Sequence, residues 1–409
     1  MRKYLILIWF LLLGQSLWAQ SDSLRLGYSV QGTVVDAASG KVLESVHVTI
    51  PGRNQATVTN QDGFFILKSN SPIEEIECSL LGYKTNRLQT QERMRIPLYK
   101  ESLTLEAASI ITGNPEEIVR AAADNIWTTY CTHPELLECF YRETLQKRNR
   151  FTYVSEAVAR LYKGRYSGGN IAQDAAALEK SRILVSQRKR DTLSIKTQGG
   201  PTMAIHVDLV KNSGVLFTRQ EMSLYHYEML TPQYIGDRLQ FVIQITPDAE
   251  VDYALYNCVL YIDREYLTFT RIEASLDMSD QGKATQLMLV RKPVTLRFYP
   301  DESSVVINYR LEGRHTRLEY IRTTMRFRCD WRKRLLKTSY TAINELVVTD
   351  VRPEAVPIPR QERFRSTDSM SDKAALFLDK DFWADYNIIE PSESLEHAMG
   401  RLRRDRGKN

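Results

Sequence analysis

Segments in which apolar and polar residues alternate fill most of the chain from residue 135 to residue 350. Examples are "LECFYRETLQ", "FTYVSEAVARLY", "YNCVLYID", "LTFTRIEASL" and "LEYIRTTMRFRC". A period of two gives each strand one buried face and one wetted face, which is typical of antiparallel sheets. A tight hairpin is expected around Asp263 and Arg264. We therefore predict a large, curved antiparallel sheet inside a domain that spans residues 112–350.

A helix is predicted just before this sheet, over residues 115–130. Asn114 can cap it, Pro115 suits its first position, and Glu117 can complete a capping box. Its apolar stripe is expected to pack on the sheet, which makes the domain α+β. The stripe consists of Ile118, Val119, Ala122, Ile126 and Tyr130.

Residues 28–100 show a different pattern, in which short strands are separated by turn residues at intervals of about 8–12 residues, as in β-sandwiches. The stretch "NQDGFFIL" places Asp62 and Gly63 where a hairpin must reverse, and Gly63 permits a positive φ. Asn60 and Gln61 carry no charge, which argues against a calcium loop. We interpret Asp62 and Gly63 as a structural turn.

The first 19 residues have the pattern of a secretory signal peptide. Arg2 and Lys3 precede nine apolar residues, Leu5 to Leu13, and Ala19 suits the cleavage site. Gln15 follows "LLLG" where a lipoprotein would carry its lipidated cysteine, so no lipid anchor is expected. No later segment is apolar enough to span a bilayer as a helix. The mature protein is predicted to be exported and either soluble or peripherally attached.

Charge is concentrated at the two ends of the chain. The net charge is +5, and it falls to +3 when Arg2 and Lys3 are removed with the signal peptide. The tail "RLRRDRGKN" carries +4, so the rest of the chain is near −1. This distribution gives no nucleic-acid surface. We expect the tail to be a solvated, frayed end, and contact with anionic lipid is the alternative.

The five cysteines, Cys78, Cys131, Cys139, Cys258 and Cys329, form no CxxC pair. Their odd number leaves at least one thiol unpaired. Most of them sit in strand-like apolar runs, which favours buried free thiols. Cys131 with Cys139 is the one pair to test for a disulfide.

The segment "GTVVDAASGKVLESVHVTIPG", then "TVTNQDGFFIL" and "LLGYKT", resembles the carboxypeptidase regulatory-like domain. The resemblance implies a transthyretin-like β-sandwich and no peptidase activity. In Bacteroidota-type bacteria this domain precedes outer-membrane receptors and other envelope proteins, so a periplasmic location, peripheral to the outer membrane, is implied.

The second domain resembles an envelope-protein domain of unknown function. The motifs are "HPELLECFYRET", "YVSEAVARLYKG", "IKTQGGPTMAIHVDLVKN" and "LYNCVLYIDREYLTFTRIEASL". Some members of that family continue into an outer-membrane barrel, and barrel function is not carried over to this chain. The "YNCVLYID" hairpin is also similar to half-barrel lipoprotein carriers.

The chain lacks the HExxH, GxSxG, GxxxxGK and GxGxxG motifs, and its six histidines are scattered. His315 and Glu319 would stand about 13 Å apart on a strand, too far to share a metal, and we expect solvated cross-strand pairing. Glu156 could be a buried general acid, but an ion pair with Arg142 across adjacent strands is favoured. "QGGP" could offer N–H groups to an anion, although a connecting loop needs the same residues. No cofactor, no metal and no enzymatic activity are predicted.

Residues 351–409 are expected to form a linker followed by a docking segment with the basic tail. Leu395, Met399 and Leu402 have the spacing of a short terminal helix that docks. Phe382, Trp383 and Tyr386 in "DFWADYN" are candidate partner-binding anchors, and the alternative is that they clamp this segment onto the domain.

The sequence thus favours a mainly β, non-enzymatic periplasmic or cell-envelope protein for binding or assembly. Its partner would be an envelope protein or outer-membrane component, with lipid as a further candidate and no nucleic acid. One alternative is a lipid or lipoprotein carrier, which needs an apolar cavity of about 300–1,000 Å³. A helix 115–130 that filled the concave face of the sheet would contradict it. The other alternative is a hydrolase with dispersed catalytic residues, which needs two titratable groups in one pocket.

Overall fold

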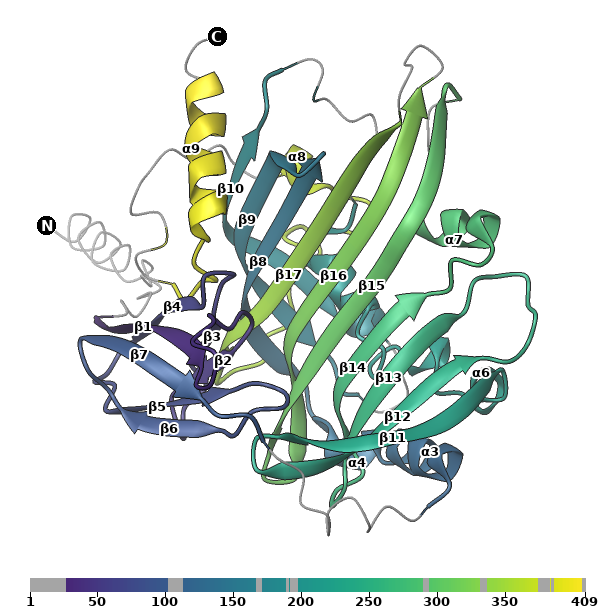
Figure 1. Ribbon diagram of the computed structural model, residues 1–409, viewed down its shortest axis with the longest axis horizontal. Coiled ribbons are helices and arrows are strands. Elements are labelled where there is room, and N and C mark those ends of the chain that lie inside the picture. The colour runs from purple at the N-terminus through teal and green to yellow at the C-terminus, as the bar shows by residue number, and fades with distance from the viewer. Residues whose placement is uncertain are drawn as a thin grey trace, which may run out of the picture.

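The computed structural model describes residues 27–101, 113–166, 171–188, 191, 198–289, 294–331, 337–373, 383 and 386–406. The predicted signal peptide and Phe382 lie outside these residues. The described chain forms a small two-sheet unit, a large antiparallel sheet, and a C-terminal segment that ends in a helix (Figure 1).

The N-terminal unit has the predicted mainly β architecture of two small sheets. Strands β4 (Phe64–Ser69), β1 (Tyr28–Asp36) and β7 (Arg93–Leu98) form one sheet, and β3 (Ala56–Val58), β2 (His47–Thr49), β5 (Glu75–Ser79) and β6 (Asn86–Gln89) form the other. Inward-facing residues such as Val34, Val48 and Phe65 are fully buried between the sheets. We call this unit the sandwich. Its strands β3 and β4 are edge strands.

The large sheet has ten strands, in the order β10-β9-β8-β17-β16-β15-β14-β13-β12-β11. Their bounds are β8 Glu135–Lys147, β9 Arg150–Lys163, β10 Ala175–Val185, β11 Tyr225–Ile235, β12 Arg238–Pro247, β13 Tyr256–Asp263, β14 Phe269–Leu276, β15 Leu296–Glu312, β16 His315–Trp331 and β17 Thr338–Arg352. Every pairing is antiparallel, as the alternation predicts. The hairpin around Asp263 and Arg264 joins β13 to β14. Strand β8 pairs with β17, so the first strand of the sheet lies beside the last.

One face of this sheet, the inner face, carries the main core. Short helices pack there: α3 (Pro115–Asp124), α4 (Ile126–Thr129), α5 (Gly200–His206) and α6 (Arg219–Met222), with the 3-10 turns η1 (Ile171–Gln173) and η3 (Ser213–Val215) near them in the chain. The predicted helix is two helices, because it breaks at Asn125, but Val119, Ala122, Ile126 and Tyr130 of its stripe are buried in this core as expected. The inner face is therefore filled by the protein itself.

The remaining helices are α7 (Gln281–Met288), α8 (Met370–Lys373) and α9 (Glu393–Arg406). Helix α9 lies against the outer face of the sheet at β9 and β10, where Leu395, Met399 and Leu402 are buried. Our expectation of a frayed tail is wrong up to Arg406, because this apolar stripe holds the helix in place. Among the described residues, no helix has the length and apolarity needed to cross a membrane.

All five cysteines are buried free thiols, so Cys131 and Cys139 are not joined. Burial raises the pKa of the Cys131 thiol to about 12, and the charge of Glu135 acts in the same direction. Such thiols remain protonated and unreactive at neutral pH.

Replacing Gly63 by alanine should destabilise the sandwich. Its φ is +70°, and a Cβ there would lie 2.7 Å from the carbonyl oxygen of Val34. Gly40 has a φ of +69° with nothing within 4 Å, so it isolates the cost of the backbone conformation. In urea unfolding, Gly40→Ala should lose about 1 kcal/mol, and Gly63→Ala at least about 2 kcal/mol. Equal losses would contradict the close approach.

Candidate functional site

The C-terminal segment runs between the sandwich and the outer face of the large sheet. We call residues 386–392, with Trp383, the strap. The side chain of Asn387 pairs with the backbone of Lys68 on edge strand β4: Lys68 N donates to Oδ1 over 2.7 Å, and Nδ2 donates to Lys68 O over 3.0 Å. One amide therefore satisfies a donor and an acceptor that an edge strand would leave open.

Successive residues of the strap bind different parts of the protein. Thr57 Oγ1 of the sandwich donates to Ile388 O over 2.8 Å, and Asn60 Nδ2 donates to Pro391 O over 3.1 Å. Between them, Arg142 Nη2 of the sheet donates to Ile389 O over 2.5 Å. The strap is thus hydrogen-bonded to both units at once.

The Asn60–Gly63 turn also receives the start of α9. Asn60 Oδ1 accepts from Asp62 N and Phe64 N over 2.9 and 3.0 Å, which fixes the turn. Asp62 Oδ2 accepts from Glu393 N, the first residue of α9, over 2.6 Å. A carboxylate at a helix N-terminus is stabilising because the helix dipole is positive there. Our interpretation of Asp62 as a turn residue alone therefore missed this contact, which no local sequence pattern signals.

Beneath the strap, Arg142 and Glu156 form a buried ion pair of 2.7 Å, and Arg182 Nη2 lies 2.5 Å from the other oxygen of Glu156. Glu156 is 0% exposed. Burial raises the pKa of Glu156, but the charges of Arg142 and Arg182 outweigh it and hold the pKa below its usual value. The carboxylate stays ionised, so it is not a general acid. Arg182, directly opposite Glu156 in register, was not predicted.

Of the aromatic residues singled out in the sequence, Trp383 packs edge-on against Phe140, with ring centroids 5.7 Å apart, and Arg182 lies 5.3 Å from the Trp383 ring. Trp383 is only 6% exposed, so its ring is enclosed by this chain. Tyr386 is half-buried, with the Lys180 ammonium 5.8 Å from its ring.

The sandwich also contacts the sheet directly. His47 Nδ1 of β2 lies 3.2 Å from Glu319 of β16, and its Nε2 lies 2.9 Å from Asn308 Nδ2 of β15. The expectation for Glu319 as part of a solvated pair is wrong, because the sandwich covers it, whereas His315 is exposed. Burial raises the pKa of Glu319, but the interaction with His47 outweighs it and holds the pKa below its usual value.

Further polar contacts join the two units at the edges of this interface. Arg322 Nη1 donates to Glu44 over 2.7 Å, and Gln55 Nε2 donates to Asp350 over 2.8 Å. An apolar cluster lies under them that draws on the sandwich, the sheet and the strap. It consists of Val58, Phe140, Val158, Tyr320, Val347, Trp383, Ile388 and Ile389, with Tyr386 packed against it. We call the strap and these contacts the joint.

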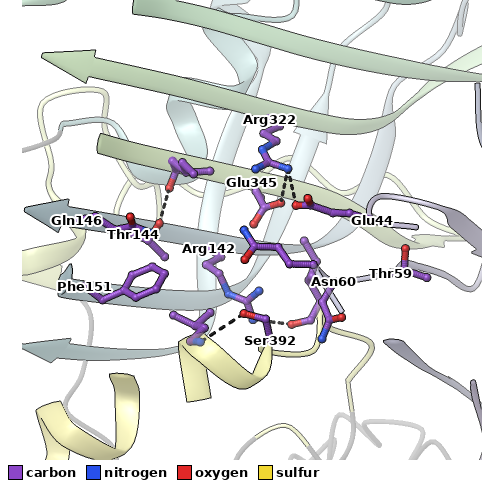
Figure 2. Close-up of a pocket in the computed structure, with 14 residues that line it drawn as sticks. Glu44, Thr59, Asn60, Arg142, Thr144, Gln146, Phe151, Arg322, Glu345 and Ser392 are labelled. Atoms are coloured by element: carbon purple, nitrogen blue, oxygen red, sulfur yellow. Dashed lines mark hydrogen bonds and ion pairs between the residues drawn. The ribbon is translucent and has the colours of Figure 1, made fainter. Parts of the chain in front are cut away.

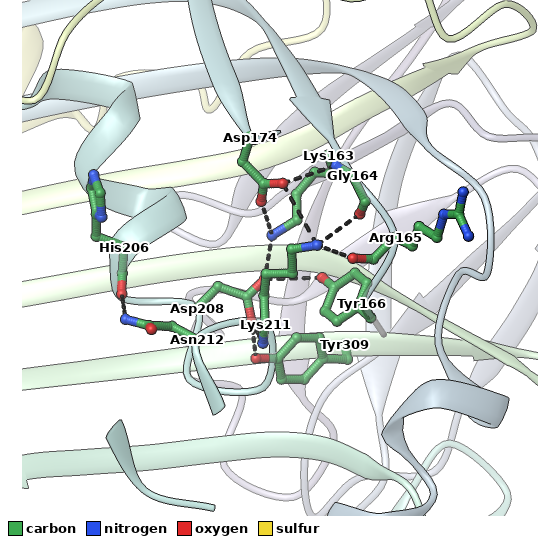
Figure 3. A network of polar contacts seen from close by, with 10 residues as sticks. All are labelled: Lys163, Gly164, Arg165, Tyr166, Asp174, His206, Asp208, Lys211, Asn212 and Tyr309. Atoms are coloured by element: carbon green, nitrogen blue, oxygen red, sulfur yellow. Dashed lines mark hydrogen bonds and ion pairs between the residues drawn. The ribbon is translucent and has the colours of Figure 1, made fainter. Parts of the chain in front are cut away.

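A second polar cluster lies in the core on the inner face (Figure 3). It consists of Lys163, Tyr166, Asp174, Asp208, Lys211 and Tyr309. Its four charged side chains are at most 2% exposed. Asp208 accepts from Lys163 Nζ, from Tyr166 over 2.9 Å and from Tyr309 over 2.6 Å.

Lys211 completes this cluster by donating to the carbonyl oxygens of Gly164 and Arg165. Burial raises the pKa of Asp208, but the charge of Lys163 outweighs it, so this carboxylate stays ionised. The cluster ties two loops to β9 and β15.

One cavity lies at the joint and has a volume of about 40 Å³ (Figure 2). A second, on the inner face beside Tyr141 and Met203, has a volume of about 10 Å³. Both are far below the volume that a carrier needs for an acyl chain. "QGGP" lies near the second, where Gly200 begins α5 and Gly199 N donates to Asp368 O. No group of three or more metal-ligating side chains occurs within the described residues.

Comparisons with known proteins identify the first unit. A family model described as the CarboxypepD_reg-like domain matches residues 30–110, and no curated protein matches the chain. Among solved structures, an outer membrane lipoprotein-sorting protein domain from Vibrio parahaemolyticus is 13% identical, covers 58% of this chain and 92% of its own, and has a TM-score of 0.25.

A LolA superfamily protein from Nitrosomonas europaea is 11% identical, covers 61% of this chain and 100% of its own, and has a TM-score of 0.18. A DUF1329 family protein from Desulfovibrio piger is 9% identical, covers 58% and 94%, and has a TM-score of 0.23.

The contact of Asp62 with α9 leads to a second prediction. Asp62→Ala should cost about 0.5–1 kcal/mol in urea unfolding and should abolish the hydrogen-exchange protection of the Glu393 amide. Asp280→Ala is the matched control, because Asp280 caps α7 by accepting from Gly282 N and Lys283 N over 2.8 and 3.0 Å. The control should fray α7 and leave α9 unchanged. Unaltered exchange at Glu393 in Asp62→Ala would refute the contact.

Two carboxylates of the joint should respond to pH in opposite directions. The folded-state pKa of Glu319 lies below the usual 4.5, so its ionisation stabilises the fold above that value and the contribution is lost as the pH falls. Glu319→Gln should therefore cost about 1–2 kcal/mol at pH 7 and progressively less below pH 4.5.

Glu390 of the strap has a folded-state pKa that is raised instead of lowered. Burial raises its pKa above the usual 4.5, although Lys68 and Arg142 act against this. The folded state therefore binds its proton more tightly, and stability increases as the pH falls through the raised pKa. Glu390→Gln should be more stable than the wild type at pH 7 and equal to it below pH 4.5, as measured by urea unfolding across pH. A loss of stability at pH 7 would contradict the assignment.

Proposed function

We propose that this protein is a non-enzymatic binding or assembly protein of the cell envelope, in which the sandwich and the large sheet act as one rigid body. The proposal rests on the contacts of the joint. Its strap is hydrogen-bonded to Lys68, Thr57 and Asn60 of the sandwich and to Arg142 of the sheet. Two domains linked only by a flexible connector would not bury such contacts.

Rigidity supports a binding role because a preorganised surface loses little conformational entropy when a partner docks. The partner would be an envelope protein or an outer-membrane component, and the protein would act in the periplasm after removal of the predicted signal peptide. The match of residues 30–110 to a CarboxypepD_reg-like domain supports a docking or spacer role for the sandwich.

The two alternatives have less support. A carrier needs a large apolar cavity, whereas the inner face is packed by residues such as Val119, Tyr130 and Ile205. A hydrolase needs titratable groups at a pocket that a substrate can enter. Glu44 and Glu345 line the cavity at the joint, but both lie within ion-pair distance of Arg322. The buried cluster around Asp208 has its charges matched within the core.

The proposal predicts co-purification with a partner in a defined ratio. The tagged full-length protein would be isolated from the periplasm of its own bacterium and weighed intact by native mass spectrometry. We expect one envelope component in a fixed ratio, and a lower yield of it with the joint variant Asn387→Ala, in which the contact with Lys68 is lost. A bound acyl lipid in a one-to-one ratio would favour the carrier, and a bare monomer would contradict the proposal.

A further inference from the structure

Charged residues form an alternating row across five neighbouring strands on the outer face of the sheet. In strand order from β10 to β16, direct partners in register are Arg182, Glu156, Arg142, Glu345 and Arg322. Each residue therefore faces an opposite charge on the next strand, an arrangement that favours ion pairs.

The row is interrupted at one point. Arg142 and Arg182 both pair with Glu156, at 2.7 and 2.5 Å, and Arg322 lies 4.0 Å from Glu345. No ion pair joins Arg142 to Glu345 within the described part of the chain, although the two are direct register partners. The cavity of about 40 Å³ lies between them, with Asn60, Thr144 and Ser392 also in its wall (Figure 2).

Each of the two facing residues has a polar atom without a partner. Nε and Nη2 of Arg142 are used by Glu156 and Ile389, while Nη1 donates to no described residue. Oε1 of Glu345 accepts from Tyr320 over 2.9 Å, while Oε2 accepts from none of the described residues. Neither atom is fully buried, and both residues line the cavity.

The two facing residues present opposite charges to the cavity. At one end, Arg142 offers the unused Nη1 of a cation whose neighbouring carboxylates are Glu156 and Glu390. At the other end, Arg322 is shared by Glu44 and Glu345, which leaves an excess of −1. A lone anion would be repelled by Glu345, and a lone cation would be repelled by Arg142.

We propose that this cavity binds a small zwitterion, with anionic oxygens at Arg142 Nη1 and an ammonium at Glu345 Oε2. The cavity that the two side chains line has a volume of about 40 Å³, so the ligand must be small. The chemistry is that of an α-amino acid, and it is shared by the phosphoethanolamine headgroup of a lipid. The site does not depend on the envelope function proposed above.

Calorimetry on the full-length mature protein tests the site. Glycine and phosphoethanolamine are the zwitterionic probes, and acetate and methylammonium carry one charge each. We expect binding of at least one zwitterion and none of the single ions. Equal binding of acetate and glycine would overturn the proposal, because it would indicate a simple anion site.

The variant Glu345→Gln removes the charge at the ammonium end and keeps an oxygen that can accept from Tyr320. It should weaken binding of the zwitterion by about tenfold or more, since hydrogen bonds to charged groups contribute about 1.5–3 kcal/mol. Glu273→Gln is the matched control, because Glu273 lies in the same row beyond Val306, pairs with Arg271 and does not line the cavity. Equal affinity in the two variants would overturn the site.

Binding to lipid vesicles distinguishes a lipid headgroup from a soluble amino acid as the ligand. Binding to phosphatidylethanolamine vesicles but not to phosphatidylglycerol vesicles, with loss in Glu345→Gln, would assign a lipid headgroup. Binding of free glycine without vesicle binding would assign a soluble amino acid. Absence of binding to both free zwitterions and to phosphatidylethanolamine vesicles would overturn the proposal.

Discussion

The guanidinium group of Arg142 joins the large sheet to the strap, and the strap in turn is hydrogen-bonded to the sandwich. It belongs to β8 of the sheet, pairs with Glu156 of the neighbouring strand, and donates to Ile389 of the strap. Arg142 is 3% exposed and Glu156 is 0% exposed. Removing Glu156 would take the shared carboxylate from both Arg142 and Arg182, which is far more costly than losing a surface pair. This pair orients the arginine that holds the strap at Ile389, and the strap acts together with direct contacts between the sandwich and the sheet.

Contacts between distant parts of the chain recur throughout the structure. Strand β8 pairs with β17, so the first and last strands of the large sheet in chain order are neighbours within it. The strap then returns to residues more than 300 positions earlier, at Thr57, Asn60 and Lys68. Each of these contacts closes a loop of more than 300 residues, so forming it costs more conformational entropy than a local contact does.

Periodicity in the sequence predicted the elements well where one face is buried and the other is wet. The alternation in β8, β9 and β13–β17 indicated an antiparallel sheet, and the stripe of Leu395, Met399 and Leu402 indicated a docking helix. The family resemblance located the sandwich, and the match to residues 30–110 agrees with it. These features depend on local spacing, which a single sequence records.

Most contacts between residues that are distant in the chain could not be predicted from the sequence. The pair of Arg142 and Glu156 could be predicted because their strands are adjacent in the chain. The contacts of Arg182 with Glu156, of His47 with Glu319 and of Asp62 with α9 could not, because no local pattern specifies which of these elements are neighbours in space. Asp62 illustrates the difference: its turn follows from its neighbours, but its contact with Glu393 follows from the fold. The unpaired atoms of Arg142 and Glu345 could not be predicted either, because they depend on the register of β8 and β17.

We infer that the strap fixes the sandwich against the sheet as one rigid body. Double electron–electron resonance between spin labels at two exposed positions, Glu92 of the sandwich and Arg326 of the sheet, measures this directly. The five native thiols are all buried, which favours selective labelling at introduced cysteines. A rigid joint predicts one narrow distance distribution in the full-length protein. A broad or multiple distribution in the wild-type fold would contradict it.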